Sequence, residues 1–293
     1  MISFKLISKL PNYKTIIGLR SMSQNEIINI GATFSEHFEI VPALSEELKN
    51  EAFRVRHQVY CEDLNYESQR ASKYETDEYD INALHLLMKS VRLNKFIGCT
   101  RLIRPSTDDP YQLLPFEKCC GGTLDYSKVG SLLLSRNKIA EVSRLAVISE
   151  FRRRKGESER PINLSDEDYG ISNHAHFRFP YIPLGLFIGT VELAYIHNID
   201  ILFMLTEKKL AMHFSKLGAN LDFIGIPIEH RGVRIPSMVN TLEIIKNMKP
   251  MFRPLYNLIS KVIYESYSRS NQNPFIIQKN PAFSNTTNQQ LSC

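Results

Sequence analysis

The stretch LHLLMKSVRLNKFIGCTRLI, residues 84–103, contains two apolar runs joined by the three residues Arg92, Leu93 and Asn94. Runs of this length, rich in Leu, Ile and Val, are typical of β-strands. A connection of three residues joins only strands that run antiparallel, because parallel neighbours need a long crossover. The stretch therefore predicts a β-hairpin within an antiparallel sheet.

A helix is expected before this hairpin. Ser45 is a suitable N-cap, Glu46 and Glu47 follow it in the first turn, and apolar residues recur at helical spacing as far as Val59. Residues 67–80 then form a polar, acid-rich loop that leads into the first strand.

After the hairpin, strands alternate with helices. We expect a third strand over 138–148, a long apolar helix from Pro183 to about His197, a strand over 199–206, a helix ended by Gly218 in a left-handed conformation, and an amphipathic helix over 253–267. This order predicts an α/β fold with a mixed, largely antiparallel central sheet.

The chain is expected to hold one domain with additions at its ends. Residues 1–35 show little periodicity and are interpreted as an N-terminal arm, and residues 36–268 form the domain. A basic and polar insertion interrupts the domain at about 151–182. Residues 269–293 are rich in Asn, Gln and Ser and are predicted to be disordered.

Composition limits the class of protein. Of 293 residues, 43% are hydrophobic and 23% are charged, as in soluble globular proteins, and the net charge of +5 suits an acidic protein partner as well as nucleic acid. Five cysteines without a CxxC pair disfavour a disulfide framework or a zinc ribbon. No apolar run approaches the roughly 18 residues of a membrane span. These features predict a cytoplasmic protein whose association with membranes is peripheral at most.

Short motifs carry a resemblance to known enzymes. R-x-x-x-Y from Arg56 to Tyr60, then Tyr66, TDEYD at 76–80, CTRLIRP at 99–105 and EVSR at 141–144 resemble the acyl-homoserine-lactone (autoinducer) synthases and the N-acyl amino acid synthases of the GNAT superfamily. VRHQVYCEDLNYE, Leu114-Pro115, EVSRLAV and HRGVRIP resemble, more narrowly, the PEP-CTERM/exosortase system-associated acyltransferases. The resemblance covers about residues 35–268. It implies a GNAT-like α/β/α fold and acyl transfer.

The resemblance also assigns residues to the site. It implies a charged catalytic set made up of Arg56, Asp77, Asp80, Arg101, Glu141 and Arg144. It implies a substrate-binding set made up of Tyr60, Tyr66, Ser143, Leu145, Ala146 and Val147. Tyr60 and Tyr66 stand where the autoinducer synthases have phenylalanine and tryptophan. This departure bears on the homoserine-lactone product more than on acyl transfer.

The geometry of a strand constrains the E-x-x-R pair. On a flat strand Glu141 and Arg144 face opposite sides, so they meet in one site only if a β-bulge intervenes. GNAT-like proteins resemble one another in having such a bulge, where splayed strands leave backbone N–H groups free to bind the acyl carbonyl. The acyl phosphopantetheine would then lie between this strand and residues 199–206.

The six charged residues balance three against three, which suggests a buried ionic network. We interpret Glu141 as the general base, acting directly or through water, and the two tyrosines as walls of the acceptor pocket. An arginine, Arg56 or Arg101, would hold the carboxylate of an amino acid by a bidentate contact.

Other motifs have simpler interpretations. Cys61 is expected to be a buried small hydrophobe, because GNAT-like transfer is direct. RRRKGES, from Arg152, is a basic surface patch that suits acyl carrier protein, and the His174-x-His176 pair is a polar loop rather than a metal site. His230-Arg231-Gly232 either shapes the rim of the site or ends a strand.

The predicted function is N-acyl transfer of a long fatty acyl group onto the amine of an amino acid or similar small acceptor. The donor is a phosphopantetheine thioester on acyl carrier protein, rather than acyl-CoA, and we expect neither a bound cofactor or metal nor a nucleic-acid partner. One alternative is an acyl-homoserine-lactone synthase that uses S-adenosylmethionine. Another is a non-catalytic GNAT-shaped module that binds acyl carrier protein or a membrane surface through its basic loop and last helix.

Overall fold

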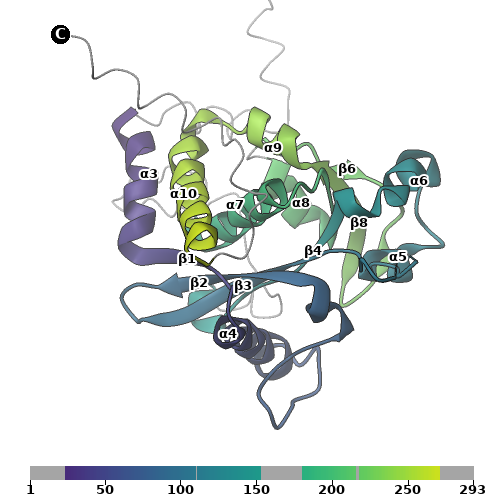
Figure 1. Ribbon diagram of the computed structural model, residues 1–293, viewed down its shortest axis with the longest axis horizontal. Coiled ribbons are helices and arrows are strands. Elements are labelled where there is room, and N and C mark those ends of the chain that lie inside the picture. The colour runs from purple at the N-terminus through teal and green to yellow at the C-terminus, as the bar shows by residue number, and fades with distance from the viewer. Residues whose placement is uncertain (1–23, 110, 153–179, 216–217, 271–293) are drawn as a thin grey trace, which may run out of the picture.

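An eight-stranded sheet with helices on both faces forms the centre of the molecule (Figure 1). The computed structural model describes residues 24–109, 111–152, 180–215 and 218–270. The predicted disordered tail beyond residue 270, most of the predicted insertion with its basic patch, and the His174-x-His176 pair lie outside the described residues. Within the described ranges, no helix is long and apolar enough to cross a membrane.

The sheet is mixed and mostly antiparallel, as the sequence predicts. Its order is β1-β2-β3-β4-β5-β8-β6, with β7 paired to β8 beside this path. The strands are β1 (Phe38–Pro42), β2 (Ala83–Ser90), β3 (Lys95–Ile103), β4 (Ile139–Val147), β5 (Ile201–Thr206), β6 (Asp222–Phe223), β7 (Ile228–Glu229) and β8 (Val233–Asn240). The parallel pair is β4–β5, and the other ladders are antiparallel.

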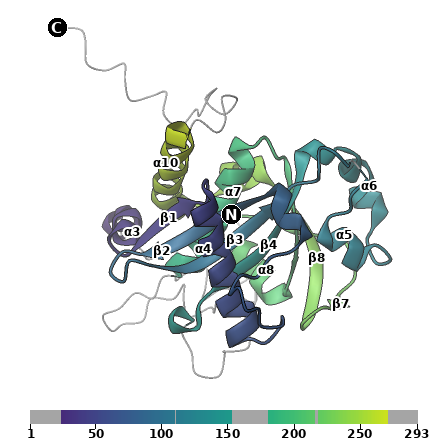
Figure 2. The ribbon, with the colours of Figure 1, turned by 60° about the horizontal axis from the view of Figure 1, so that its bottom comes forward.

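Helices cover the sheet in two layers. Figure 1 shows one helix, α4, on one face and most of the others on the opposite face, while α5 and α6 lie at one end; Figure 2 shows α4 crossing in front of the sheet. The helices are α3 (Gln24–His37), α4 (Glu46–His57), α5 (Pro115–Cys120), α6 (Tyr126–Leu134), α7 (Tyr181–Ile196), α8 (Lys208–Ser215), α9 (Thr241–Asn247) and α10 (Arg253–Ser270).

Helix α4 begins where its sequence predicts. The Ser45 hydroxyl accepts a hydrogen bond from the backbone N–H of Leu48 at 3.3 Å, which satisfies one of the donors that a helix start leaves open. After His57 the helix widens into a π-helical segment, Gln58–Asp63, whose buried residues include Tyr60 and Cys61. Such segments are rare and often lie at functional sites.

Helix α7 is apolar on all sides and lies between the sheet and α10. Thirteen of its 16 residues are buried, which agrees with the long apolar helix predicted around Pro183. One buried residue is Glu192, whose carboxylate accepts hydrogen bonds from the hydroxyls of Tyr256 and Ser260 on α10, each at 2.8 Å. Burial raises the pKa of Glu192 above its usual range.

The structure corrects the predicted N-terminal arm. Residues 24–37 form helix α3, and its Ile30 and Phe34 side chains are only 2% exposed in the core. These two apolar side chains lie one helical turn apart and belong to the main hydrophobic core, with the Phe34 ring 5.8 Å from that of Phe38 on β1, so the domain begins before residue 36. Strand β8 was also missed, because Pro236 lies inside it and proline removes a donor from a ladder.

Candidate active site

Strand β4 carries the predicted bulge. Cys99 of β3 pairs with Ala146 and Arg101 pairs with Ser143, so one residue on β3 lies opposite two on β4. Arg144, one of those two, has a φ of +52°, in the left-handed region that non-glycine residues seldom adopt. The extra residue breaks the strict alternation of faces, and Glu141, Ser143 and Arg144 all line one cavity.

The cavity lies where β4 and β5 part. Their parallel pairing ends at Val142 and Met204, although β4 continues to Val147 and β5 to Thr206. A cavity of about 300 Å³ opens at this point. Its walls come from β4, β5, the π-helical segment, helices α5 and α8, and the turn between β7 and β8. A cavity is therefore present between β4 and β5, where the sequence predicts that the phosphopantetheine thioester lies.

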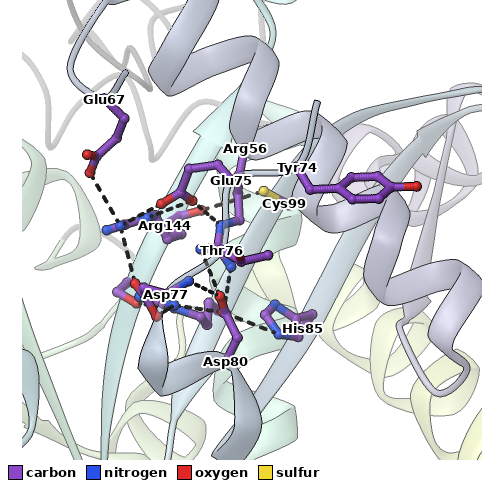
Figure 3. Close-up of polar contacts among 12 residues, drawn as sticks. Arg56, Glu67, Tyr74, Glu75, Thr76, Asp77, Asp80, His85, Cys99 and Arg144 are labelled. Carbon is purple, nitrogen blue, oxygen red and sulfur yellow. Dashed lines mark hydrogen bonds and ion pairs between the residues drawn. The ribbon is translucent and has the colours of Figure 1, made fainter. Parts of the chain in front are cut away.

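Behind one wall, Arg56 joins two carboxylates of the acid-rich loop. Its Nε donates to Glu75 at 2.5 Å, and its two terminal nitrogens donate to the two Asp80 oxygens at 2.6 and 3.1 Å (Figure 3). The Arg56 and Glu75 side chains are each 1% exposed. Charge-assisted pairs in this bidentate arrangement are the strong class of hydrogen bond.

Two further arginines complete the network. Arg101 donates to Asp77 at 2.6 Å, to Asp80 at 2.7 Å and, through Nε, to the Ser143 hydroxyl at 3.0 Å. Arg144 donates to Glu75 at 2.9 and 3.2 Å and to Asp77 at 3.3 Å.

The predicted balance of three arginines against three carboxylates is present, with one change of member. Glu75 takes the place that was predicted for Glu141. Sequence reasoning missed it because residues 67–80 have no periodic pattern and Glu75 precedes the recognised TDEYD motif by one residue. The network ties α4, the loop, β3 and β4 together, and it fixes the wall on which the cavity is built.

Two of the network carboxylates, those of Glu75 and Asp80, are held in the ionised form. Burial alone would raise the pKa of Glu75, but the hydrogen bond from Arg144 and the charge of Arg56 outweigh it and lower this pKa to about 2. The pKa of Asp80 is likewise lowered by Arg56 and Arg101 against the opposing effect of burial. His85 lies 3.7 Å from Asp80, and burial lowers its pKa to about 3, so it is neutral.

Glu141 has the opposite environment. Its side chain lines the cavity, is 4% exposed, and accepts a hydrogen bond from the backbone N–H of Phe116 at 2.8 Å, in the first turn of α5. Burial raises its pKa to about 8, although the Phe116 N–H and the charges of Arg101 and Arg144 act in the other direction. A carboxyl group whose pKa lies near neutrality is suited to exchange a proton with a substrate.

The two predicted tyrosines both line the cavity. Tyr60 is buried, and burial raises its pKa to about 12, so its hydroxyl keeps its proton. The Arg144 guanidinium lies 5.3 Å from the centre of the Tyr60 ring, and the Arg231 guanidinium lies 5.8 Å from that of Tyr66. Cationic groups over aromatic faces are favourable at such distances.

The remaining predicted residues divide into three groups. Asp77, Arg101, Ser143 and Leu145 line the cavity, whereas Arg56 and Asp80 lie behind its wall. Ala146 and Val147, predicted to contact substrate, are instead buried in the core at 0% and 3% exposure, because β4 resumes its alternation against β3 after the bulge. Cys61 is 0% exposed, as predicted for a small buried hydrophobe, and burial raises its pKa.

Some cavity residues had no clear signal in the sequence. His230 and Arg231 line the cavity from the turn between β7 and β8, and Arg234 lines it from the start of β8, so this motif shapes the rim, one of its two predicted roles. Lys209, His213 and Phe214 line it from α8, and Cys119 lines it from α5.

Comparison with known proteins gives one family match and several likenesses of fold. Residues 55–159 match the model described as the acetyltransferase (GNAT) domain. No curated protein matches the chain. Similar solved structures include TofI in a ternary complex with an inhibitor and MTA (16% identity, TM-score 0.49, covering 77% of this chain and 98% of that one). They also include MesI, a CoA-dependent acyl-homoserine lactone synthase (19% identity, TM-score 0.49, covering 74% of this chain and 94% of that one). A third is FeeM, an N-acyl amino acid synthase from uncultured soil microbes (15% identity, TM-score 0.46, covering 72% of this chain and 94% of that one).

Proposed function

Residues 55–159 match the GNAT acetyltransferase domain, and on this premise we propose that the chain moves a fatty acyl group from a carrier thioester to the amine of an amino acid or similar small acceptor. The predicted GNAT fold and acyltransferase class agree with this match. The narrower resemblance to the PEP-CTERM/exosortase system-associated acyltransferases stays a prediction.

The observation that carries the proposal is the position of Glu141. It is a buried carboxyl group with a pKa of about 8 on the wall of a cavity that opens where β4 and β5 part. An amine attacks a thioester only when its nitrogen lone pair is free, so a nearby group must take a proton from the ammonium form. Glu141 is the cavity-lining carboxyl group whose environment suits this role.

The proposed reaction then proceeds in a balanced sequence. Glu141 takes a proton from the acceptor ammonium, the nitrogen bonds to the carbonyl carbon, and the C–S bond breaks as the carrier thiolate leaves. The nitrogen then loses a second proton to become an amide, and the thiolate gains that proton. Backbone N–H groups of the bulged part of β4 would stabilise the negative charge on the carbonyl oxygen. The ion network holds Arg144 and the bulge in place, so that little reorganisation is needed during the reaction.

We propose acyl carrier protein, rather than CoA, as the carrier. A second hollow borders the cavity, and Lys208, Lys209 and Arg231 are among its lining residues. These cations would favour the approach of an acidic protein, although Asp63 and Glu207 also lie there. Comparing the same acyl group on acyl carrier protein and on CoA tests this choice directly.

The apolar part of the cavity bears on the acyl group. The wall predicted along α7 is covered, because no described residue of α7 lines the cavity. Leu145, Met204, Leu210 and Phe214 provide apolar surface instead. The acyl group would enter between β4, β5 and α8, and its predicted long chain is tested by comparing rates with short and long acyl groups on the same carrier.

The proposed acceptor is tested with purified protein and acyl carrier protein charged with long-chain acyl groups. Given a mixture of the twenty amino acids and S-adenosylmethionine, we expect mass spectrometry to show one or a few N-acyl amino acids. Acyl-homoserine lactone without any acyl amino acid would favour the autoinducer-synthase alternative. Failure to transfer from either acyl carrier protein or CoA would favour the non-catalytic module.

A further inference from the structure

We propose that Arg231 binds the α-carboxylate of the acceptor, and that the Glu67 carboxylate occupies this position until the acceptor displaces it. The inference rests on the proposed function and narrows it, because it requires an acceptor that carries both an amine and a carboxylate. It also replaces the sequence-based expectation that Arg56 or Arg101 holds that carboxylate.

Neither arginine of that expectation is available to a substrate. Arg56 does not line the cavity, and Glu75 and Asp80 occupy its guanidinium. Arg101 reaches the cavity, but its side chain is 1% exposed and it already donates to two aspartates and a serine. Withdrawing either guanidinium from the network would leave buried carboxylates unpaired, which is strongly unfavourable.

Arg231 is placed differently. It lines both the cavity and the adjoining hollow, and its side chain is 30% exposed. Its guanidinium donates to Glu67 Oε1 at 2.5 Å and lies 5.8 Å from the centre of the Tyr66 ring. An ion pair that is this exposed contributes little free energy, so another carboxylate can replace Glu67 on the arginine with little loss of stability.

The contacts of Glu67 show how a carboxylate is bound beside Arg231. The same oxygen that accepts from Arg231 lies 3.6 Å from the Arg144 terminal nitrogen, so one carboxylate lies near two guanidinium groups, one from β4 and one from the turn between β7 and β8. Figure 3 shows Glu67 reaching toward Arg144 from outside the main network. Arg144 follows Glu141 by three residues on β4, and both line the cavity. A carboxylate held here would place its amine on the side of Glu141.

The turn that carries Arg231 is held in a defined shape. Arg231 has a φ of +55° and Gly232 a φ of +93°. The backbone N–H of His230 donates to the Gly232 carbonyl at 3.0 Å, and Arg234 donates to the carbonyls of His230 and Arg231 at 3.4 and 3.2 Å. A left-handed arginine is unfavourable in itself, and residues held in this way are concentrated at functional sites.

Two other cations near the cavity are less suitable. Arg234 supports the turn and lies 3.4 Å from Glu207. Lys209 lines both hollows but is exposed, and its ammonium lacks the planar fork that matches a carboxylate. Lys209 is therefore the competing candidate that an experiment must separate from Arg231.

The test measures steady-state acylation of the best amino acid and of its carboxamide by the wild type and by Arg231→Gln, Glu67→Gln and Lys209→Gln. Arg269→Gln is the matched control, because it removes an arginine that pairs with Glu265 on the exposed side of α10. We expect the wild type to prefer the free amino acid, and Arg231→Gln to raise its KM by at least about tenfold and to lose that preference. Glu67→Gln should lower this KM, because the internal competitor is gone. Lys209→Gln should keep the preference for the free amino acid over its carboxamide, and Arg269→Gln should behave like the wild type.

Several results would overturn the inference while leaving the proposed function intact. They are equal use of amino acid and carboxamide by the wild type, a preference that survives in Arg231→Gln, and a preference lost in Lys209→Gln. An unchanged KM in Glu67→Gln would overturn the role given to Glu67, and this arm does not depend on how well Arg231→Gln folds. Absence of acylation with every acceptor would instead contradict the proposed function, and the inference would fall with it.

Discussion

Replacing Glu141 with glutamine lowers kcat for acyl transfer by about 10²- to 10⁴-fold, the range typical of a lost general base. Glutamine keeps the shape of the side chain and can still accept the hydrogen bond from the Phe116 N–H. The variant is therefore expected to melt no lower than the wild type at pH 7. Initial rates and thermal unfolding of the two proteins, measured in the same buffer, check both parts of the prediction.

The pH dependence distinguishes a base from a structural group. Because the pKa of Glu141 is raised to about 8, the base form is gained as pH rises through that value. The ratio of wild-type to Glu141→Gln rates should therefore increase from pH 6 to pH 9, and titration of the acceptor amine cancels in this ratio. Equal rates across this range would show that Glu141 is not the base.

The same shift has a consequence for stability. The folded protein holds a proton on Glu141 that the unfolded chain releases, so this contribution to stability is complete below a pH of about 4.5 and is lost as pH rises through about 8. Glu141→Gln should therefore gain stability relative to the wild type at pH 9 compared with pH 6.

Replacing Glu75 with alanine destabilises the fold by about 3–5 kcal/mol, the usual effect of removing one partner from a buried ion pair. Arg56 and Arg144 both donate to Glu75, so the change leaves two guanidinium groups without their shared carboxylate. Chemical denaturation measures the loss. The matched control, Glu265→Ala, removes an exposed carboxylate of α10 and should change the free energy of unfolding by less than about 1 kcal/mol.

Lowering the pH should remove the stability that Glu75 provides, whereas raising the pH removes the contribution of Glu141. The pKa of Glu75 is lowered to about 2, so the stability it provides is present above a pH of about 4.5 and is lost as pH falls toward 2. The difference in stability between wild type and Glu75→Ala should shrink over that interval. A difference that stays constant from pH 7 to pH 3 would contradict the ionic role of Glu75.

Much of the framework could be predicted from local pattern. The hairpin of β2 and β3, the start of α4 and the apolar α7 each depend on residues close in sequence, where periodicity and capping are informative. The bulge in β4 was also predictable, because Glu141 and Arg144 cannot share a site on a regular strand. Likewise, the position of Asp77 and Asp80 followed from a motif of five residues.

The parts that were missed depend on contacts between distant segments. Glu75 has no pattern of its own, and its role becomes visible only when α4 brings Arg56 and β4 brings Arg144 to the same loop. The identity of Arg231 as a cavity residue requires the turn between β7 and β8 to fold back toward Glu67, 164 positions earlier in the sequence. The spacing of residues along the chain gives no information about contacts between such distant segments.

The burial of α7 sets an order on the formation of this domain during synthesis. The strands β1 to β4 precede α7 in the chain, but α10, which covers its other side and supplies the hydroxyls for Glu192, is the last helix of the described domain. A nascent chain that ends before α10 would expose an apolar helix surface with a carboxyl group in its middle. The domain is therefore expected to complete its core only after the ribosome has made residues 253–270, and in the interval it would depend on protection from aggregation.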